Sequence, residues 1–145
     1  MPKEKLQQLA HDFMESHALK QVDNIMNLFV ADGNIHYWGA SVGEEGFSRE
    51  ALQTFFERDF AEAENITFSI DDLTVFDTEF SGVIIGNWQI NYQLKGEVDT
   101  QNITLRTTLY AELINECWKI RHAHWSVAYG EGLAEPASVE VEVSQ

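Results

Sequence analysis

Residues 117–128 read Cys-Trp-Lys-Ile-Arg-His-Ala-His-Trp-Ser-Val-Ala, and this stretch decides the fold. Side chains of different character alternate along it, as they do when a β-strand sends successive residues to opposite faces. One face is expected to carry Trp118, Ile120, His122, His124 and Ser126, and the other Cys117, Lys119, Arg121, Ala123, Trp125 and Val127. Because neither face is purely polar or purely apolar, we expect a central strand of a curved sheet that closes a pocket on one side and meets a partner on the other.

The composition indicates a single domain with no affinity for anionic polymers. The chain has 145 residues, of which 44% are hydrophobic, and this is enough for one buried core. Its 9 Lys and Arg against 24 Asp and Glu give a formal net charge of -15, which repels phosphate backbones and anionic lipids. We therefore expect no nucleic-acid partner and no membrane partner. A single cysteine, no signal-peptide pattern and no apolar run of membrane-spanning length together predict a cytoplasmic protein.

Three N-terminal segments have apolar residues at intervals of three and four, which is typical of amphipathic helices. The first follows Pro2 and has the stripe Leu6, Leu9, Ala10, Phe13, Met14 and His17. The second has the stripe Val22, Ile25, Met26, Leu28 and Phe29, and we expect it to end before Asp32-Gly33. A short strand over 34–38 and a glycine-rich loop over 39–46 come next. Ser48 is the predicted N-cap of the third helix, whose stripe is Leu52, Phe55, Phe56, Phe60 and Ala63.

From residue 65 the period changes from 3.6 to two, so strands are predicted over 66–75, 103–113 and 117–128. The phase slips at Asp71-Asp72, which indicates a bulge that bends the strand. A longer strand is predicted between the turn at Asp77-Thr78 and Leu94, with Gly82 and Gly86 as further bends. The expected fold is α+β: a cone of three N-terminal helices packed on a strongly curved antiparallel sheet, in the order α-α-β-α-β-β-β-β. We assign the cone to residues 1–130 and treat 131–145 as an acidic C-terminal appendage, in which 139–143 has a strand pattern.

Three segments resemble a known family, the SnoaL-like domains of the nuclear transport factor two-like superfamily, which have cystatin-like α+β folds. Residues 22–32, Val-Asp-Asn-Ile-Met-Asn-Leu-Phe-Val-Ala-Asp, are similar to its second helix, and 43–52, Gly-Glu-Glu-Gly-Phe-Ser-Arg-Glu-Ala-Leu, resemble its entry into the third. Most specific are Arg106-Thr-Thr108 and Trp118-Lys-Ile-Arg-His-Ala-His-Trp-Ser126, which resemble the Arg-x-Thr and Trp-x-Ile-x-His-x-His-x-Ser pairing. The resemblance covers residues 6–128 and also extends to the association domain of calcium/calmodulin-dependent protein kinases.

The resemblance implies a fold that hosts isomerases, cyclases, dehydratases, transport factors and oligomerisation modules, so it does not define one activity. The family's isomerases carry a carboxylate base near the end of the first strand, where this chain has His36-Tyr37-Trp38 and no carboxylate. If the protein is an enzyme, we expect His124 or His36 to act as the base, because imidazole titrates near neutrality. Tyr37 or Arg106 would then stabilise developing negative charge.

His122 and His124 share the expected face, and a His-x-His pair can present two imidazoles to one metal ion. A metal site needs a third ligand and only His11, His17 and His36 remain as imidazoles, so we predict hydrogen-bonding histidines, no metal and no cofactor. Arg106 has two interpretations. It forms an ion pair on the outer face, with Glu112 or a residue of a neighbouring strand, or it binds an anionic ligand through a bidentate contact.

The chain is rich in aromatic residues, with 4 Trp and 9 Phe, and some of them are expected to line the cone. The residues that we place around a pocket are Phe13, Tyr37, Trp38, Phe56, Phe60, Trp88 and Trp125. Such a pocket suits a small, flat, hydrophobic molecule. A bulge that the sequence does not reveal would exchange the two faces of a strand. Either Trp125 or His124 can therefore point into the cavity.

These observations favour a homodimeric protein, associated through the outer face of its sheet, with an apolar pocket for a small organic ligand. Cofactor-free isomerisation, cyclisation or dehydration is the chemistry expected of such a site, and the sequence leaves open whether any reaction occurs. The alternative is a non-catalytic association module whose sheet and acidic surface bind another protein.

Overall fold

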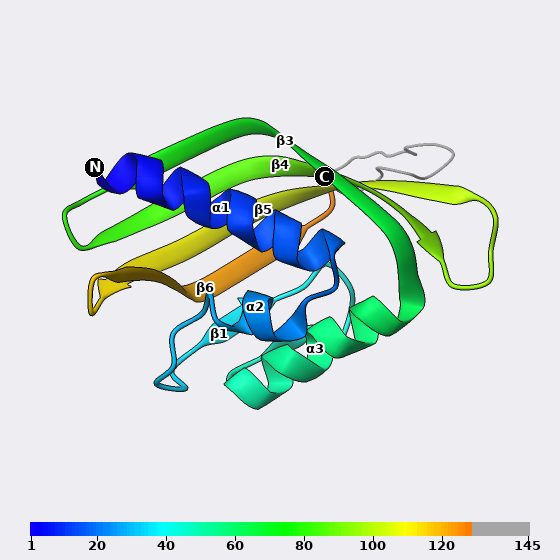
Figure 1. Cartoon of the computed structure of the whole chain (residues 1–145), viewed down its shortest axis with the longest axis horizontal. Helices are drawn as coiled ribbons and strands as arrows, with labels where there is room; N and C mark the ends of the chain where they lie inside the picture. The colour runs from blue at the N-terminus through cyan, green and yellow to red at the C-terminus, as the bar shows by residue number, and fades with distance from the viewer. Residues whose placement is uncertain (129–145) are drawn as a thin grey trace, which may run out of the picture.

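The computed structural model describes residues 1–128. Within these residues, three helices and six strands follow one another (Figure 1). They are α1 (Pro2–Ala18), α2 (Val22–Met26), β1 (His36–Trp38), β2 (Glu45–Gly46), α3 (Arg49–Glu62), β3 (Ala63–Asp77), β4 (Ser81–Leu94), β5 (Thr100–Ile114) and β6 (Cys117–Ser126). The tail over 131–145, including the strand pattern at 139–143, lies outside the described residues.

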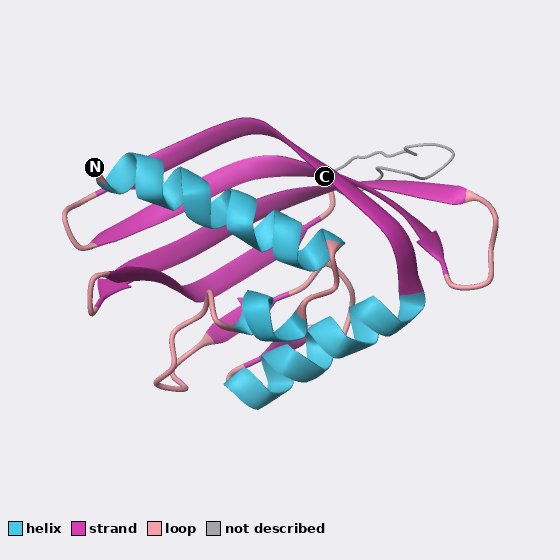
Figure 2. Ribbon diagram, in the orientation of Figure 1, coloured by secondary structure: helices cyan, strands magenta, loops and turns pink. Residues whose placement is uncertain are grey.

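The six strands form one sheet in the order β2-β1-β6-β5-β4-β3. Neighbours are antiparallel except β1 and β6, which run parallel. The long strands curve, and all three helices lie on one face of the sheet (Figure 2). We call this the inner face and the opposite one the outer face. The predicted α+β cone is therefore confirmed, with one addition, because two residues at the end of the expected 39–46 loop pair with β1 as β2.

The curvature has local causes in β3. Its pairing with β4 shifts register between Asp71 and Thr74, where the sequence predicted a bulge, and Asp72 has a positive φ of 57°. A bulge adds a residue to one strand and bends it. The bent sheet wraps around α1, and the approach is close at Gly82, where an added Cβ would collide with the side chain of Leu6.

A bulge in β6 corrects the expected alternation of residues 117–128. Tyr110 of β5 pairs with His122, and the next residue, Ala111, pairs with Ile120, so Arg121 is the extra residue. At the bulge the alternation of side chains between the two faces of the sheet shifts by one residue. As a result Ile120, Ala123 and Trp125 are all buried. Ile120 was expected to share a face with His122 and His124, and this was wrong. The Arg121 side chain forms two salt bridges, from Nε to Oε1 of Glu112 at 2.8 Å and from Nη2 to Oδ2 of Asp32 at 3.0 Å.

The second helix is shorter than its apolar stripe predicted, because α2 ends at Met26. After it the chain turns to pair with β6: the Val30 amide donates to the Ile120 carbonyl (2.9 Å), and the Ile120 amide donates to the Leu28 carbonyl (2.8 Å). Bonds to a central strand thus replace the last helical turn. The predicted cap of α3 is present, since the Ser48 side chain accepts a hydrogen bond from the Ala51 amide at 3.1 Å.

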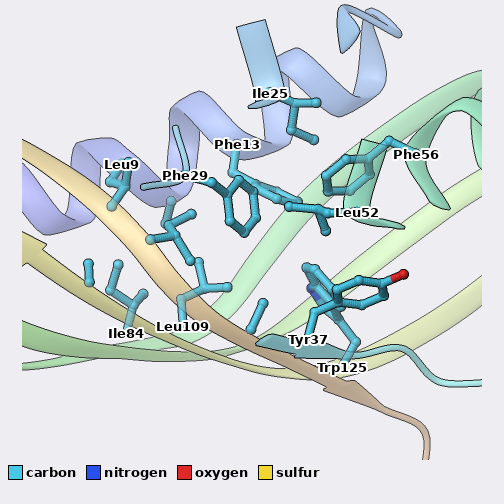
Figure 3. Packing of buried hydrophobic residues seen from close by; sticks show 14 of the residues in the cluster. Leu9, Phe13, Ile25, Phe29, Tyr37, Leu52, Phe56, Ile84, Leu109 and Trp125 are labelled. Carbon is cyan, nitrogen blue, oxygen red and sulfur yellow. The ribbon is translucent and has the colours of Figure 1, made fainter. Parts of the chain in front are cut away.

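The core lies between the helices and the inner face (Figure 3). Phe13 of α1 is at its centre, with ring centroids 5.1 Å from Trp88, 5.8 Å from Trp125 and 5.9 Å from Phe56. These rings come from α3, β4 and β6, so one side chain ties the first helix to three other elements. Aromatic burial is the largest contribution that single residues make to such a core.

Candidate functional site

A cavity of about 230 Å³ opens between the inner face and the helices. Its floor is formed by β3, β4, β5 and β6, and its sides by α1, α3 and the loop before β2. The lining residues are Phe13, His17, Gly39, Ala40, Ser41, Glu44, Phe55, Phe56, Asp59, Glu62, Ala63, Ile66, Phe68, Trp88, Ile90, Tyr92, Leu94, Ile103, Leu105 and Trp125. The wall is therefore mostly aromatic and aliphatic, with few polar groups, as in cavities that hold small organic molecules.

The aromatic residues of the wall contact one another. Trp125 stacks on Phe55 at 5.9 Å, and Phe55 lies 5.4 Å from Phe56. Phe68 meets Trp88 edge to face at 6.1 Å. Such offset and edge-to-face pairs stabilise each other beyond simple burial.

The polar groups gather where α1 and α3 meet the cavity. His17, in the last turn of α1, has Nε2 3.5 Å from Oδ2 of Asp59 in α3. Its side chain is 14% exposed and that of Asp59 is 41% exposed. The imidazole packs among Phe13, Phe60 and Phe68, with centroids 5.1–6.3 Å apart. Among the described residues nothing hydrogen-bonds to its buried Nδ1.

Two carboxylates, Glu44 and Glu62, line the cavity in addition to Asp59, and none of the lining residues is Lys or Arg. Glu44 has a structural role as well, because its Oε1 accepts a hydrogen bond from the Ser41 amide at 2.9 Å and so closes the loop. The cavity therefore carries acidic groups without a compensating cation on its wall.

Four of the residues predicted for a pocket lie on this wall: Phe13, Phe56, Trp88 and Trp125. Phe60 is buried behind it and stacks on Phe56 at 6.2 Å. Tyr37 is buried against Phe55, and its hydroxyl donates to the Ala51 carbonyl at 3.2 Å. Burial raises the pKa of the Tyr37 hydroxyl. Of Trp125 and His124, Trp125 is the one that lines the cavity, because its side chain points to the inner face after the bulge at Arg121.

Three further predicted site residues, His36, Trp38 and His124, lie on the outer face. Together with Phe47 and His122 they form what we call the outer cluster. Ring centroids lie 5.0 Å apart between His36 and His122, and also between Trp38 and His124. The two Nδ1 atoms of His36 and His122 are 3.0 Å apart. Burial lowers the pKa of His122 below its usual value. The proposed base role of His36 and His124 stays a prediction, and neither residue lines the cavity.

Arg106 is exposed and points away from the cavity. Its Nε donates to the Ser126 hydroxyl at 3.1 Å on the neighbouring strand. The predicted pairing of Arg106 with Glu112 does not occur, because the two residues lie too far apart along β5, and Glu112 contacts Arg121. Hydrogen bonds from Tyr110 and Arg121 lower the pKa of Glu112. Within the described residues, Arg106 has no contact that identifies an anion site.

His17 and Asp59 were not singled out as functional from the sequence. The signal was present, however: each is a polar residue on the apolar stripe of its helix, His17 after Phe13 and Asp59 between Phe56 and Phe60. Sequence alone does not show that the two stripes meet.

Within residues 1–128 no three His, Cys, Asp or Glu side chains are grouped closely enough to hold a metal ion. No helix in this part of the chain is long and apolar enough to cross a membrane.

Comparison with known proteins gives a family match and structural relatives. The family described as SnoaL-like domain matches residues 6–130. A nuclear transport factor 2-like superfamily protein from Salmonella enterica is 15% identical, with a TM-score of 0.79 and coverage of 92% of this chain and 95% of that one. A protein from Novosphingobium aromaticivorans provisionally named scytalone dehydratase is 9% identical, with a TM-score of 0.78 and coverage of 88% and 84%.

A third structure, from Xanthomonas campestris, is provisionally named a calcium/calmodulin-dependent protein kinase II association domain. It is 19% identical, with a TM-score of 0.74 and coverage of 84% of both chains. No functionally curated protein matches the sequence. At these identities the structural relatives establish the fold and not the activity.

Proposed function

Because the chain belongs to the SnoaL-like domain family, we propose that it binds a small, largely apolar organic molecule in the cavity of the inner face. The observation that carries this proposal is the cavity wall. Seven Phe, Tyr and Trp rings line a space that the helices do not fill, those of Phe13, Phe55, Phe56, Phe68, Trp88, Tyr92 and Trp125. Flat aromatic walls with few polar groups favour a flat, hydrophobic ligand.

The chemistry that fits such a site is cofactor-free proton transfer, as in isomerisation, cyclisation or dehydration. A relative with the same fold is provisionally named a dehydratase, which supports this choice of chemistry without fixing a substrate. A cytoplasmic location remains part of the proposal, supported by the exposed, unpaired Cys117, which fits a reducing compartment.

Native mass spectrometry of freshly purified protein tests the proposal. A retained ligand would add a few hundred daltons in gentle conditions and be lost on denaturation. The Ile103→Trp variant, which fills the cavity from β5, should lose this added mass. Asn102→Trp is the matched control, because Asn102 is exposed on the same strand and does not line the cavity. If Ile103→Trp keeps the ligand as well as the control does, the ligand is bound elsewhere.

A second candidate function is association with a protein partner through the outer face, and the partner proposed first is a second copy of this chain. The specific observation is a row of neighbouring residues on four strands, Ile85, Thr108, His124 and Trp38, that register places side by side. Ile85 is 38% exposed and Trp38 43%. No described helix covers this row, and exposed apolar groups on a sheet favour an interface.

The measurement for this candidate is the mass in solution by sedimentation equilibrium. We expect a dimer for the unmodified chain and a monomer for Trp38→Asp. The control is Val98→Asp, since Val98 is an exposed apolar residue in the turn between β4 and β5. A monomer in all three proteins would exclude the homodimer, and a higher symmetric oligomer would favour the association module.

A further inference from the structure

We propose that His17 and Asp59 are the proton-transferring pair of the cavity and act on an uncharged carbonyl compound. The inference rests on the proposed ligand site and adds the residues and the substrate class. It starts from two helices: α1 ends at the cavity with His17, and α3 passes it with Asp59, so that Nε2 and Oδ2 lie 3.5 Å apart on the wall.

The surroundings of His17 assign the position of its proton. Nδ1 is buried among phenylalanine rings and has no hydrogen-bond partner within residues 1–128. An unpaired N–H buried there would cost more than an unpaired lone pair, since unpaired buried donors are the rarer of the two. The neutral ring therefore carries its hydrogen on Nε2, which is the atom that faces Asp59.

This tautomer gives the two residues complementary roles. His17 offers an N–H donor, and Asp59 offers a carboxylate acceptor beside it. In a ketone, the carbonyl oxygen and the hydrogen on the neighbouring carbon are also adjacent. A donor and an acceptor 3.5 Å apart can therefore reach both at once.

The step is an enolisation. Asp59 takes the proton from the carbon next to the carbonyl, the C–H electron pair forms the carbon–carbon double bond, and the carbonyl π pair moves to the oxygen. The oxygen accepts a hydrogen bond from Nε2 of His17, which stabilises its developing charge. Charge moves from the carboxylate to the substrate oxygen, so the total is unchanged and no co-reactant is needed. Returning the proton to a different carbon completes an isomerisation.

The charges on the wall narrow the substrate class. Glu44, Asp59 and Glu62 line the cavity and none of the lining residues is Lys or Arg, so a carboxylate or phosphate on the substrate would be repelled. The remaining wall is aromatic and aliphatic. The substrate that fits is an uncharged, flat ketone or aldehyde.

The probe for this proposal is 1-indanone, a flat uncharged ketone, incubated with the full chain in D₂O. Exchange of its α-hydrogens is followed by NMR. We expect the protein to accelerate exchange over buffer, and Asp59→Asn and His17→Gln each to lower the enzymatic rate by roughly 10²-fold, the lower end of what general acid–base groups contribute. Matched controls on the same helices are Glu57→Gln and His11→Gln, which are exposed and off the cavity wall and should keep the rate.

Asp59→Asn keeps the shape of a partly exposed side chain, so it is expected to fold. Binding of 1-indanone is measured separately by saturation-transfer NMR. If 1-indanone binds but exchanges no faster than in buffer, or if Asp59→Asn exchanges as fast as the unmodified chain, the pair is not catalytic and the ligand site stands. If 1-indanone does not bind at all, the proposed ligand site is itself contradicted, and this inference with it.

Discussion

Replacing Phe13 by alanine should remove the contact that holds α1 on the sheet. The Phe13 side chain is 2% exposed, and its ring lies 5.1–6.3 Å from the rings of His17, Phe29, Phe56, Trp88 and Trp125. Burying such a ring is worth about 1.5–3 kcal/mol. The void left behind raises the cost of a buried Phe→Ala change to about 3–5 kcal/mol.

This cost is large against the total stability of a domain of this kind, which is about 5–15 kcal/mol. With a urea m-value of about 2 kcal/mol/M, the unfolding midpoint should fall by roughly 1.5–2.5 M. Phe13→Leu, which keeps most of the volume, should cost about 1–1.5 kcal/mol. The assay is equilibrium urea unfolding followed by tryptophan fluorescence, because Trp88 and Trp125 both contact this ring.

The matched control is Phe76→Ala in β3, where the phenylalanine is 63% exposed. A surface change of this kind should stay within about 0.5 kcal/mol. If Phe13→Ala costs as little as Phe76→Ala, then α1 is not anchored through Phe13, and the described packing of the helices on the inner face is wrong.

Three further predictions concern local structure. Ser48→Ala should cost about 1 kcal/mol of unfolding free energy, because it removes the cap of α3, whereas Ser48→Asp should retain stability. Gly46→Ala should cost about 1–3 kcal/mol, because the added Cβ would lie 2.7 Å from the Tyr37 ring, and equal stability would contradict the β1–β2 packing. Burial lowers the pKa of His122 below 6.5. Its contribution to stability should therefore be complete above about pH 6.5 and be lost as the pH falls, because the unfolded chain binds the proton first. His122→Gln should reduce the loss of melting temperature between about pH 7.5 and 5.5, and an unchanged loss would contradict the assigned burial.

Much of the fold was predictable, because each element has a local signal. The stripe from Leu6 to His17 predicted α1, Ser48 predicted the start of α3, and the phase slip at Asp71-Asp72 predicted the bulge that bends β3. These signals depend on neighbours a few residues away, and the structure did not override them.

The sequence did not predict local structure correctly where hydrogen bonds or salt bridges to distant residues override the local pattern. The apolar stripe continues to Phe29, yet α2 ends at Met26, because the following residues pair with Ile120 far along the chain. The residues around Arg121 likewise give no sign of the bulge, since the side chains that stabilise it, Asp32 and Glu112, come from other parts of the chain.

The site was less predictable than the fold. Phe13, Phe56, Trp88 and Trp125 were expected at a pocket and lie on the cavity wall, because large aromatic side chains that point inward line any space there. The faces of β1 and β6 could not be assigned, so His36, Trp38 and His124 were placed at the pocket and lie on the outer face. The meeting of His17 with Asp59 depends on how two helices cross the sheet, which no local pattern encodes.

The most direct test of a ligand site on the inner face uses the four tryptophan indole N–H signals in a ¹H–¹⁵N NMR spectrum, titrated with 1-indanone. Trp88 and Trp125 line the cavity, whereas Trp38 and Trp118 do not. We predict that the signals of Trp88 and Trp125 shift in a saturable way while those of Trp38 and Trp118 stay in place. Shifts confined to Trp38, or no saturable shift of any signal, would contradict a ligand site on the inner face.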